Sequence, residues 1–371
     1  MKNKFITILL TLIAIVLIIA LGVLGTIIYG EISGEQIIDL SFIEDFGYPT
    51  TEYNASIENT NTISSSEGTI GNVEGYEPKQ SSGKNLYEQL DTNAKIIYDK
   101  LYDSKESLKT GRYQVDFGDT FHDTLSQENG SKELQKQYQS AIEALIYENP
   151  DIFYLDPNNM FINIEETSRI WGSTYNVFIN NGTSIDYLDE GFESKEDVDQ
   201  AQKEIEEVKN EIIAKTNGKN DYEKIKIVHD YLIDTIDYET TVSQDYIYNI
   251  YGALVLKNCV CEGYAKSFQY LMDELGFENT IVIGTATNSK NETENHAWNY
   301  VKLNGAWYAV DVTWDDPIII GGGKLSDSSR YKYFLKGSET MDKNHVVSEK
   351  FTDAGQSFTY PELNKTDYPI Y

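Results

Sequence analysis

Cysteine is scarce in this chain: only Cys259 and Cys261 occur in 371 residues. Two cysteines cannot build the disulfide framework that stabilises small secreted proteins. A bridge between positions two apart would close a small strained ring, so no disulfide is predicted. Zinc binding by the pair would need further ligands, and the four histidines do not show zinc-finger spacing. We therefore predict no metal site and no cofactor.

Basic residues are also few, 30 against 60 acidic ones, which gives a net charge of -30. Such a surface repels phosphate backbones, and this excludes nucleic acid as a partner. The chain lacks an EF-hand loop, so the acidity is interpreted as a solvated surface and not as calcium sites. The 28 tyrosines argue against global disorder. The chain is long enough to bury a sizeable core.

One long apolar run stands out, from Phe5 to Tyr29, with no charged residue. At about 1.5 Å per helical residue it is long enough to cross a bilayer core of about 30 Å. Lys2 and Lys4 precede it, which places the N-terminus in the cytoplasm and the rest outside. The alternative is a cleaved signal peptide, with Ala20 and Gly22 near the cleavage site, and hence a secreted protein.

Composition and periodicity divide the chain into four parts. Residues 1–30 are the predicted membrane anchor, and residues 31–84 form a polar stalk rich in Ser, Thr, Asn and Gly. Residues 85–218 are a supporting α+β region, and residues 219–371 are the catalytic domain. The predicted elements of the supporting region are helices over 86–101, 134–147 and 198–212, strands over 160–164 and 175–179, and a hairpin turn at Asn181-Gly182.

Cys261 precedes a helical pattern that runs through Phe268 and Leu271 and ends near Gly276. The thiol therefore falls at a helix N-terminus, where free N–H groups and the helix dipole favour a thiolate. The same N–H groups, including that of Cys261, could stabilise an oxyanion. The alternative is a buried cysteine that packs as a small hydrophobe. Cys259, two residues upstream, is interpreted as structural or incidental.

The dipeptide Asn304-Gly305 is the strongest hairpin signal in the chain. It separates two predicted strands, 295–303 and 306–313. A two-residue turn pairs Leu303 with Ala306. The same register is then expected to continue to the far ends of both strands.

That register places Trp298 opposite Asp311 and His296 opposite Thr313. His296 and Asp311 then share one sheet face as diagonal neighbours, roughly 7 Å apart at the backbone, which lets their side chains bond. The carboxylate could hold the imidazole by one nitrogen and present the other to Cys261. This is the arrangement of a nucleophile, a base and an orienting acid.

Two rival carboxylates follow, Asp315 and Asp316, but turn and capping roles are more common for residues placed directly before a proline. His229 lies in a helix predicted over 221–237, beside an apolar stripe, and is interpreted as structural. His122 and His345 lie in polar stretches with no obvious partner, so neither is assigned to the site.

Three aromatic residues near the predicted triad, Trp298, Tyr264 and Trp314, are assigned to substrate binding. The alternative for the two tryptophans is packing in the core.

Motifs around these residues occur in a specific order and spacing. They are Val260-Cys261-Glu262-Gly263-Tyr264-Ala265, Leu275-Gly276, Gly284, His296-Ala297-Trp298-Asn299, Trp307 to Trp314, and the flanking His229-Asp230-Tyr231-Leu232 and Tyr333-Phe334-Leu335. Over about 221–345 the chain resembles the transglutaminase-like superfamily, which includes eukaryotic transglutaminases and many bacterial peptidase-like proteins.

The resemblance implies an α+β, papain-like fold in which the helix carrying the cysteine packs on an antiparallel sheet. It also implies Cys261 as nucleophile, His296 as base and Asp311 as orienting acid. No upstream residue matches the family's side-chain oxyanion donor, so that role stays open.

The first functional hypothesis is a membrane-tethered extracellular cysteine enzyme that acts through a thioester on amide bonds of surface proteins or cell-wall peptides. The acyl acceptor is water or an amine. The alternative is a catalytically silent binding or scaffold module with the same fold, since fold alone does not select function. The sequence does not indicate the oligomeric state.

Overall fold

The structure, a computed structural model, describes residues 85–169, 172–239, 246–316 and 327–369. The predicted anchor and stalk lie outside these residues. None of the helices within the described ranges combines the length and the apolar character that a bilayer crossing requires.

The first part of the described chain is helical, with a small antiparallel sheet of strand order β1-β3-β2. Its elements are α3 (Asn85–Gln89), α4 (Thr92–Asp103), α5 (Lys105–Leu108), β1 (Val115–Gly118), α6 (His122–Leu125), α7 (Gly130–Glu148), the 3-10 turn Pro157–Asn159, β2 (Phe161–Arg169) and β3 (Gly172–Asn180). The apolar periodicity predicted α7 and both long strands. The single helix predicted over 86–101 is divided into α3 and α4, because the Asp91 side chain accepts the N–H of Ala94 and begins a new helix.

The hairpin predicted at Asn181-Gly182 is wrong. β2 pairs with β3 from Phe161↔Asn180 to Arg169↔Gly172, so the two paired strands both precede Asn181. Asn181-Gly182 does form a turn, in which Ser184 donates its N–H to the carbonyl of Asn181 at 2.9 Å. No strand follows this turn directly, because residues 183–186 lack the apolar alternation that a strand needs.

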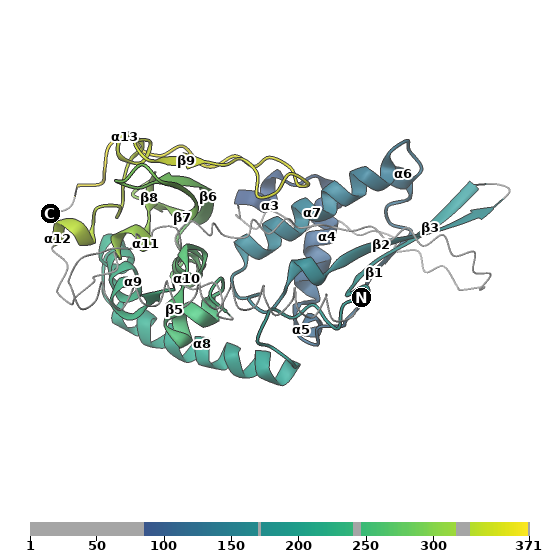
Figure 1. Cartoon of the computed structure of the whole chain (residues 1–371), viewed down its shortest axis with the longest axis horizontal. Helices are drawn as coiled ribbons and strands as arrows, with labels where there is room; N and C mark the ends of the chain where they lie inside the picture. The colour runs from purple at the N-terminus through teal and green to yellow at the C-terminus, as the bar shows by residue number, and fades with distance from the viewer. Residues whose placement is uncertain (1–84, 170–171, 240–245, 317–326, 370–371) are drawn as a thin grey trace, which may run out of the picture. The chain divides into compact units, whose positions relative to one another are not determined.

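The second part contains a four-stranded sheet of order β8-β7-β6-β9. Helix α10 packs on β6 and β7, and α8 and α9 pack on α10 (Figure 1). Its elements are α8 (Lys195–Lys215), α9 (Asp221–Thr235), β4 (Asp237–Tyr238), a π-helical turn (Gly252–Leu256), β5 (Asn258–Cys259), α10 (Cys261–Glu274), β6 (Asn279–Thr287), β7 (Thr293–Leu303), β8 (Ala306–Val310), α11 (Val312–Asp315), α12 (Asp327–Arg330), α13 (Ser338–Met341) and β9 (His345–Val347). The described chain is thus mixed α+β, and the helix that begins at Cys261 packs on an antiparallel sheet, as predicted.

Helix α9 begins and ends for identifiable reasons. Asn220 caps it in a capping box: its side chain accepts from the N–H of Glu223, and the Glu223 carboxylate accepts from the N–H of Asn220. The helix ends at Thr235, two residues earlier than predicted. Asp237 and Tyr238 instead form β4, which pairs in parallel with β5 immediately before the cysteine helix.

The hairpin of β7 and β8 follows the predicted register. Asn304 and Gly305 have φ values of 52° and 84°, the left-handed pair that a tight hairpin turn requires. Leu303 pairs with Ala306, and the same register continues to Asn299↔Val310. Strand β8 ends there, three residues earlier than predicted, because the Asp311 side chain accepts the N–H of Trp314 and begins α11.

Buried Gln269 on α10 joins the two parts of the described chain. Its amide nitrogen donates to the carbonyl of Tyr147 on α7 at 2.6 Å, and its amide oxygen accepts from the N–H of Ile281 on β6 at 2.8 Å. All described residues belong to one compact unit. The cysteine helix is therefore held against both the sheet and α7.

Candidate active site

Cys261 is the first residue of α10, as the sequence predicted. Val260 before it is extended, with φ -98° and ψ -177°, so the chain enters the helix directly from β5. The first turn of a helix has unpaired N–H groups and a positive dipole end, which favour a thiolate. The residue is 4% exposed.

Cys259 is fully buried, and burial raises the pKa of its thiol well above the ordinary value, with the charges of Cys261 and Asp316 adding to the rise. Gly263 allows it to pack there, because a Cβ at position 263 would lie 2.8 Å from the Cys259 sulfur. Cys259 is thus a structural cysteine, and Cys261 is the sulfur at the helix end.

His296 on β7 lies against Asp311, as the hairpin register predicted. Its Nε2 is 2.8 Å from Oδ2 of Asp311. The other carboxylate oxygen, Oδ1, accepts the N–H of Trp314 at 3.1 Å. The backbone of Asp311 donates to the carbonyl of Tyr333. One residue therefore ends β8, begins α11 and fixes the imidazole.

Burial and the opposite charges of the two side chains determine the pKa values of His296 and Asp311. Burial lowers the pKa of His296, but the charge and hydrogen bond of Asp311, followed by a side-chain hydrogen bond and the charge of Cys261, raise it well above the ordinary value. Burial acts in the opposite direction on Asp311, whose pKa His296 and then His345 hold far below its usual range. The histidine therefore favours the imidazolium form.

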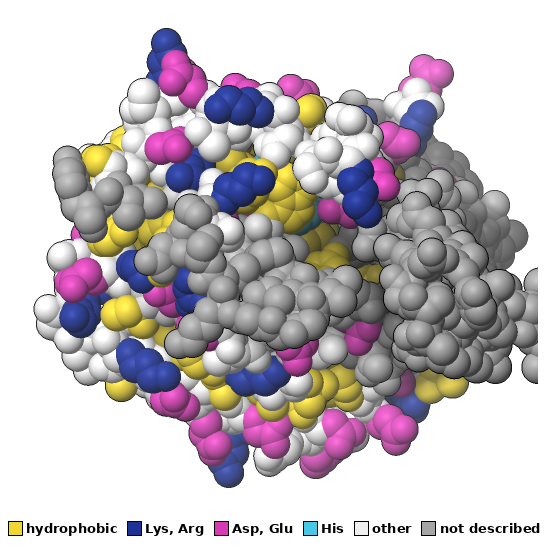
Figure 2. All heavy atoms as spheres, turned by 60° about the vertical axis from the view of Figure 1, so that its left-hand side comes forward, with side chains coloured by type: hydrophobic (Ala, Val, Ile, Leu, Met, Phe, Trp, Pro, Cys, Tyr) yellow, Lys and Arg dark blue, Asp and Glu magenta, His cyan; other side chains and the backbone are white. Residues whose placement is uncertain are grey.

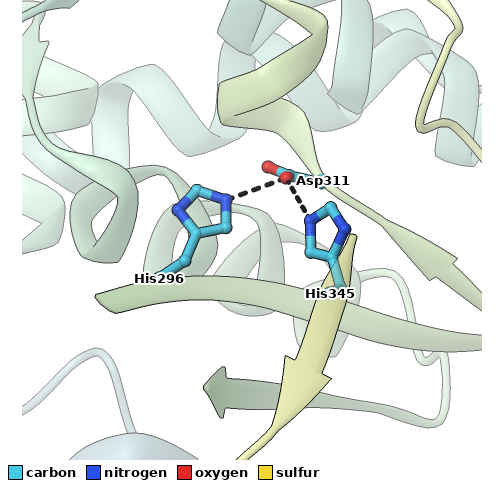
Figure 3. A group of neighbouring side chains, drawn as sticks. All are labelled: His296, Asp311 and His345. Atoms are coloured by element: carbon cyan, nitrogen blue, oxygen red, sulfur yellow. Dashed lines mark hydrogen bonds and ion pairs between the residues drawn. The ribbon is translucent and has the colours of Figure 1, made fainter. Parts of the chain in front are cut away.

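His345 is the site residue that the sequence analysis missed. Its Nε2 lies 3.0 Å from Oδ2 of Asp311, the oxygen that His296 also uses, and Figure 3 shows both rings directed at this atom. Its Nδ1 lies 2.9 Å from Oδ1 of Asn344. The expectation that His345 has no partner is therefore wrong. No local pattern marks the residue, because it reaches the site only through the pairing of β9 with β6.

His296, Asp311 and His345 each offer one ligand atom, and these atoms all lie within 4.8 Å of one another. This spacing could hold a metal ion. The three side chains are, however, only 2, 0 and 1% exposed. A metal there would lack the open coordination position that catalytic metal sites keep for water or substrate. The cluster therefore does not have the form of a catalytic metal site.

The rival carboxylates have other partners. Oδ2 of Asp315 lies 3.1 Å from Nε2 of His229, and Oδ1 accepts the N–H of Tyr333 at 2.7 Å. Asp316 accepts the hydroxyl of Tyr264 at 2.7 Å. Burial raises the pKa of both carboxyls to about 6. His229 is completely buried between Asp230 and Asp315, which agrees with its structural interpretation.

The three aromatic residues assigned to substrate binding differ in burial. Trp298 and Tyr264 are each 1% exposed, whereas Trp314 is half-buried. The rings of Trp298 and Trp314 both pack against His296 and His345, with centroid separations of 4.8 to 6.1 Å. The two tryptophans thus enclose the imidazoles. Contact with substrate stays a prediction, and Trp314 is the better placed of the three for it.

Tyr248 also lies near the cysteine. Burial raises the pKa of its phenol, and the negative charges of Glu262 and Cys261 add to the rise.

The molecular surface shows histidine atoms inside a hollow bordered by hydrophobic, acidic and basic side chains (Figure 2).

The transglutaminase-like superfamily model matches residues 207–312. No curated protein matches the chain by sequence. Among solved structures, a TGase is similar over 47% of this chain and 50% of its own length, at 15% identity and a TM-score of 0.29. A candidate cysteine protease from Cytophaga hutchinsonii is similar over 43% of this chain and 68% of its own, at 14% identity and a TM-score of 0.24.

A candidate protease from Parabacteroides distasonis is similar over 40% of this chain and 35% of its own, at 10% identity and a TM-score of 0.23. The chain thus spans half the length of the TGase and about a third of this protease. The resemblance that the motifs predicted is confirmed: residues 207–312, which contain Cys261, His296 and Asp311, are similar to the transglutaminase-like superfamily.

Proposed function

We propose that the chain is a cysteine acyl-transfer enzyme that cleaves amide bonds through a thioester on Cys261. The observation that supports this most is the buried bond of 2.8 Å between His296 and Asp311, together with the side-chain hydrogen bond through which Cys261 raises the pKa of the same imidazole. Cysteine nucleophiles paired with a histidine that a third group orients are the general form of such sites.

In the first half of the proposed reaction the Cys261 thiolate attacks the carbonyl carbon of the amide. Negative charge develops on the carbonyl oxygen, and we expect the N–H of Cys261, the first residue of α10, to bind it. The C–N bond then breaks, and the His296 imidazolium gives its proton to the departing amine. Asp311 keeps the imidazole ring in position throughout.

In the second half a water or an amine attacks the thioester. Neutral His296 takes the proton of this acceptor, the C–S bond breaks, and the thiolate–imidazolium pair is restored. With water the reaction is hydrolysis, and with an amine it is crosslinking. The fold serves both outcomes, so the acceptor has to be identified by experiment.

The thiol itself provides the first test. Purified protein should react with iodoacetamide faster at Cys261 than at Cys259, which is fully buried. His296→Gln should slow this alkylation at neutral pH at least tenfold, since the thiolate loses its cationic partner. Peptide mapping by mass spectrometry measures both rates, with Cys259→Ala as the matched control. Equal rates in the wild type and His296→Gln would contradict the proposal.

Amide chemistry is tested by incubating the protein with cell-surface extract and a labelled primary amine. Incorporation of the label indicates transfer to an amine, and new peptide termini indicate hydrolysis. Both should disappear in Cys261→Ala. Should Cys261→Ser leave a cellular phenotype of the chain intact, a binding or scaffold role would be favoured instead.

For location we propose an uncleaved single-pass anchor at residues 5–29, with the rest of the chain outside the cell. The basis is the charge asymmetry around the apolar run. Protease treatment of intact cells should release the C-terminal region while an N-terminal tag stays protected. Loss of the N-terminal tag from the mature protein would indicate a cleaved signal peptide.

A further inference from the structure

We propose that His345 is a positioning residue of the site, which holds the Asp311 carboxylate in the orientation that His296 needs. This inference rests on the proposed function. The geometry behind it is a shared acceptor: Nε2 of His296 and Nε2 of His345 approach the same oxygen, Oδ2, at 2.8 and 3.0 Å (Figure 3).

Asp311 needs such a fixing group because its backbone lies at the junction of β8 and α11. One oxygen is already used by the helix cap, at 3.1 Å from the N–H of Trp314. Rotation about the remaining side-chain bond would carry Oδ2 away from His296 unless a second donor held it. His345 is that donor, and it approaches from β9, on the other side of β6 from β7.

His345 is itself fixed on its far side. Its Nδ1 lies 2.9 Å from Oδ1 of Asn344, and the Asn344 amide donates to the hydroxyl of Tyr333 at 2.7 Å. The ring packs edge-on against Trp298 and Trp314, with centroids 5.0 and 4.8 Å away. A ring held at both nitrogens and enclosed by aromatic side chains has little freedom to turn, so it can transmit its own position to Asp311.

The backbone around His345 is equally constrained. β9 pairs with β6 at Ala286↔His345 and Gly284↔Val347. A Cβ at Gly284 would overlap the carbonyl oxygen of Val346 and approach the Trp298 ring to 2.8 Å. Glycine at position 284 therefore lets β9 and Trp298 come close enough for His345 to reach Asp311.

The role differs from direct catalysis. The His345 side chain is 1% exposed, and its ring centroid lies 5.8 Å from that of His296, with which it shares Asp311. It is therefore expected to act through Asp311 and not to touch substrate. Its removal should lower kcat and leave KM nearly unchanged, whereas a change in substrate contact would raise KM.

The test compares His345→Leu, which removes the donor, with His345→Gln, whose amide can still donate an N–H to Asp311. Alkylation of Cys261 by iodoacetamide near pH 7 reports the thiolate–imidazolium pair without a known substrate. We expect the Leu variant to react about three- to tenfold more slowly than the wild type. The Gln variant should recover to within about twofold.

Two controls separate positioning from folding. Val346→Thr changes the neighbouring exposed residue of the same strand and should leave the rate unchanged. Should His345→Leu not fold, Asn344→Leu keeps His345 but removes the partner of its Nδ1, and the rate should fall in the same direction. An unchanged rate in a folded Leu or Asn344 variant overturns the proposal, as does a Gln variant as slow as Leu.

A zinc analysis of the wild type completes the experiment. Stoichiometric zinc, with an alkylation rate that changes on chelation, would mean that the cluster is a metal site and would overturn the positioning role. The two proposals also fail differently. If His296→Gln slows alkylation and His345→Leu does not, only the role of His345 fails. If neither variant slows it, the proposed function fails.

Discussion

All four histidines of the chain lie beside a carboxylate, yet only two of them belong to the candidate site. His122 is partly exposed and lies 3.3 Å from its neighbour Asp119. His229 is enclosed between two carboxylates away from the thiol. His296 and His345 share one oxygen of Asp311. A histidine–carboxylate contact therefore does not identify a catalytic base by itself; the nearby sulfur distinguishes His296.

Asp311→Asn should be the most damaging conservative change at the site. The amide keeps the size of the side chain but removes the charge that favours the imidazolium. It can also present an N–H to a ring nitrogen that needs an acceptor. We expect a fall in kcat on the order of 10³- to 10⁴-fold, as for the orienting acid of other triads. Steady-state kinetics on the substrate found by amine labelling would measure it.

The same substitution should destabilise the fold, because two buried imidazoles lose their common partner. The expected loss in the free energy of unfolding is about 3–5 kcal/mol at neutral pH. The pKa of Asp311 is depressed in the folded state, so its contribution is present above about pH 4 and is lost as the pH falls. A variant as stable as the wild type at neutral pH would argue against this account.

His229→Leu separates stability from catalysis. It leaves Asp315 buried without its imidazole partner, so we expect unfolding to require about 3–5 kcal/mol less free energy. Alkylation of Cys261 in the folded variant should be unchanged, in contrast to His345→Leu. Urea denaturation measures the first quantity, and His122→Leu, at a partly exposed position, should change it by about 0.5 kcal/mol or less.

At the scale of elements, the β7–β8 hairpin carries most of the site geometry. Its turn fixes the register of both strands. The pairing extends from Leu303 with Ala306 to Asn299 with Val310. Asp311 follows immediately as the cap of α11. The strand ends earlier than its apolar pattern suggests because a side-chain cap competes with the last ladder positions.

Gly284→Ala tests the placement of β9 against β6. The added methyl group overlaps the Val346 carbonyl, so the edge strand has to shift and His345 moves with it. We expect a loss of about 1–3 kcal/mol in the free energy of unfolding, together with slower alkylation of Cys261. Gly276→Ala is a useful comparison, because its site is open but its φ of +78° disfavours alanine. It should cost stability without affecting alkylation.

At the scale of the whole molecule, a buried acid should set part of the pH dependence of stability. Glu143 on α7 is enclosed and accepts from Thr352 at 2.6 Å and from Gln139 at 3.1 Å. Burial raises the pKa of its carboxyl to about 7, from an ordinary value of 4.5. The folded state therefore binds more protons than the unfolded state between these values, so the free energy of unfolding falls as the pH rises through this range.

Glu143→Gln removes this titration and keeps the size of the side chain. Near pH 4.5 the variant and the wild type should be about equally stable. Near pH 8 the variant should be more stable by up to about 3 kcal/mol. Chemical denaturation across this range gives the difference curve, in which the other buried carboxyls cancel. A flat difference would show that Glu143 does not titrate in the folded protein.

The sequence predicts those features of the fold that are determined by residues close together in the chain. Caps, turns and periodic apolar residues act over a few positions, so α9, α10 and the Asn304-Gly305 turn could be predicted. The turn at Asn181-Gly182 has the same local chemistry, but no strand follows it. The His296–Asp311 pair could be predicted because one hairpin places both residues.

His345 could not be predicted in the same way. Its strand has three residues, and its partner strand β6 lies far upstream, so only the assembled sheet brings it to Asp311. Burial of Trp298 is also decided by packing from several elements and not by its own strand. Long-range pairing is therefore the part of this site that a single sequence does not reveal.

The distance in sequence between Asp311 and β9 has a practical consequence for dissecting the protein. A fragment cut after the region similar to the superfamily, at residue 312, would keep Cys261, His296 and Asp311. It would also lose β9 and leave the backbone of β6 unpaired on the side away from β7. An unpaired strand edge of this kind promotes self-association. A recombinant fragment with boundaries chosen from the similarity alone would therefore self-associate, and its activity would underestimate that of the full chain.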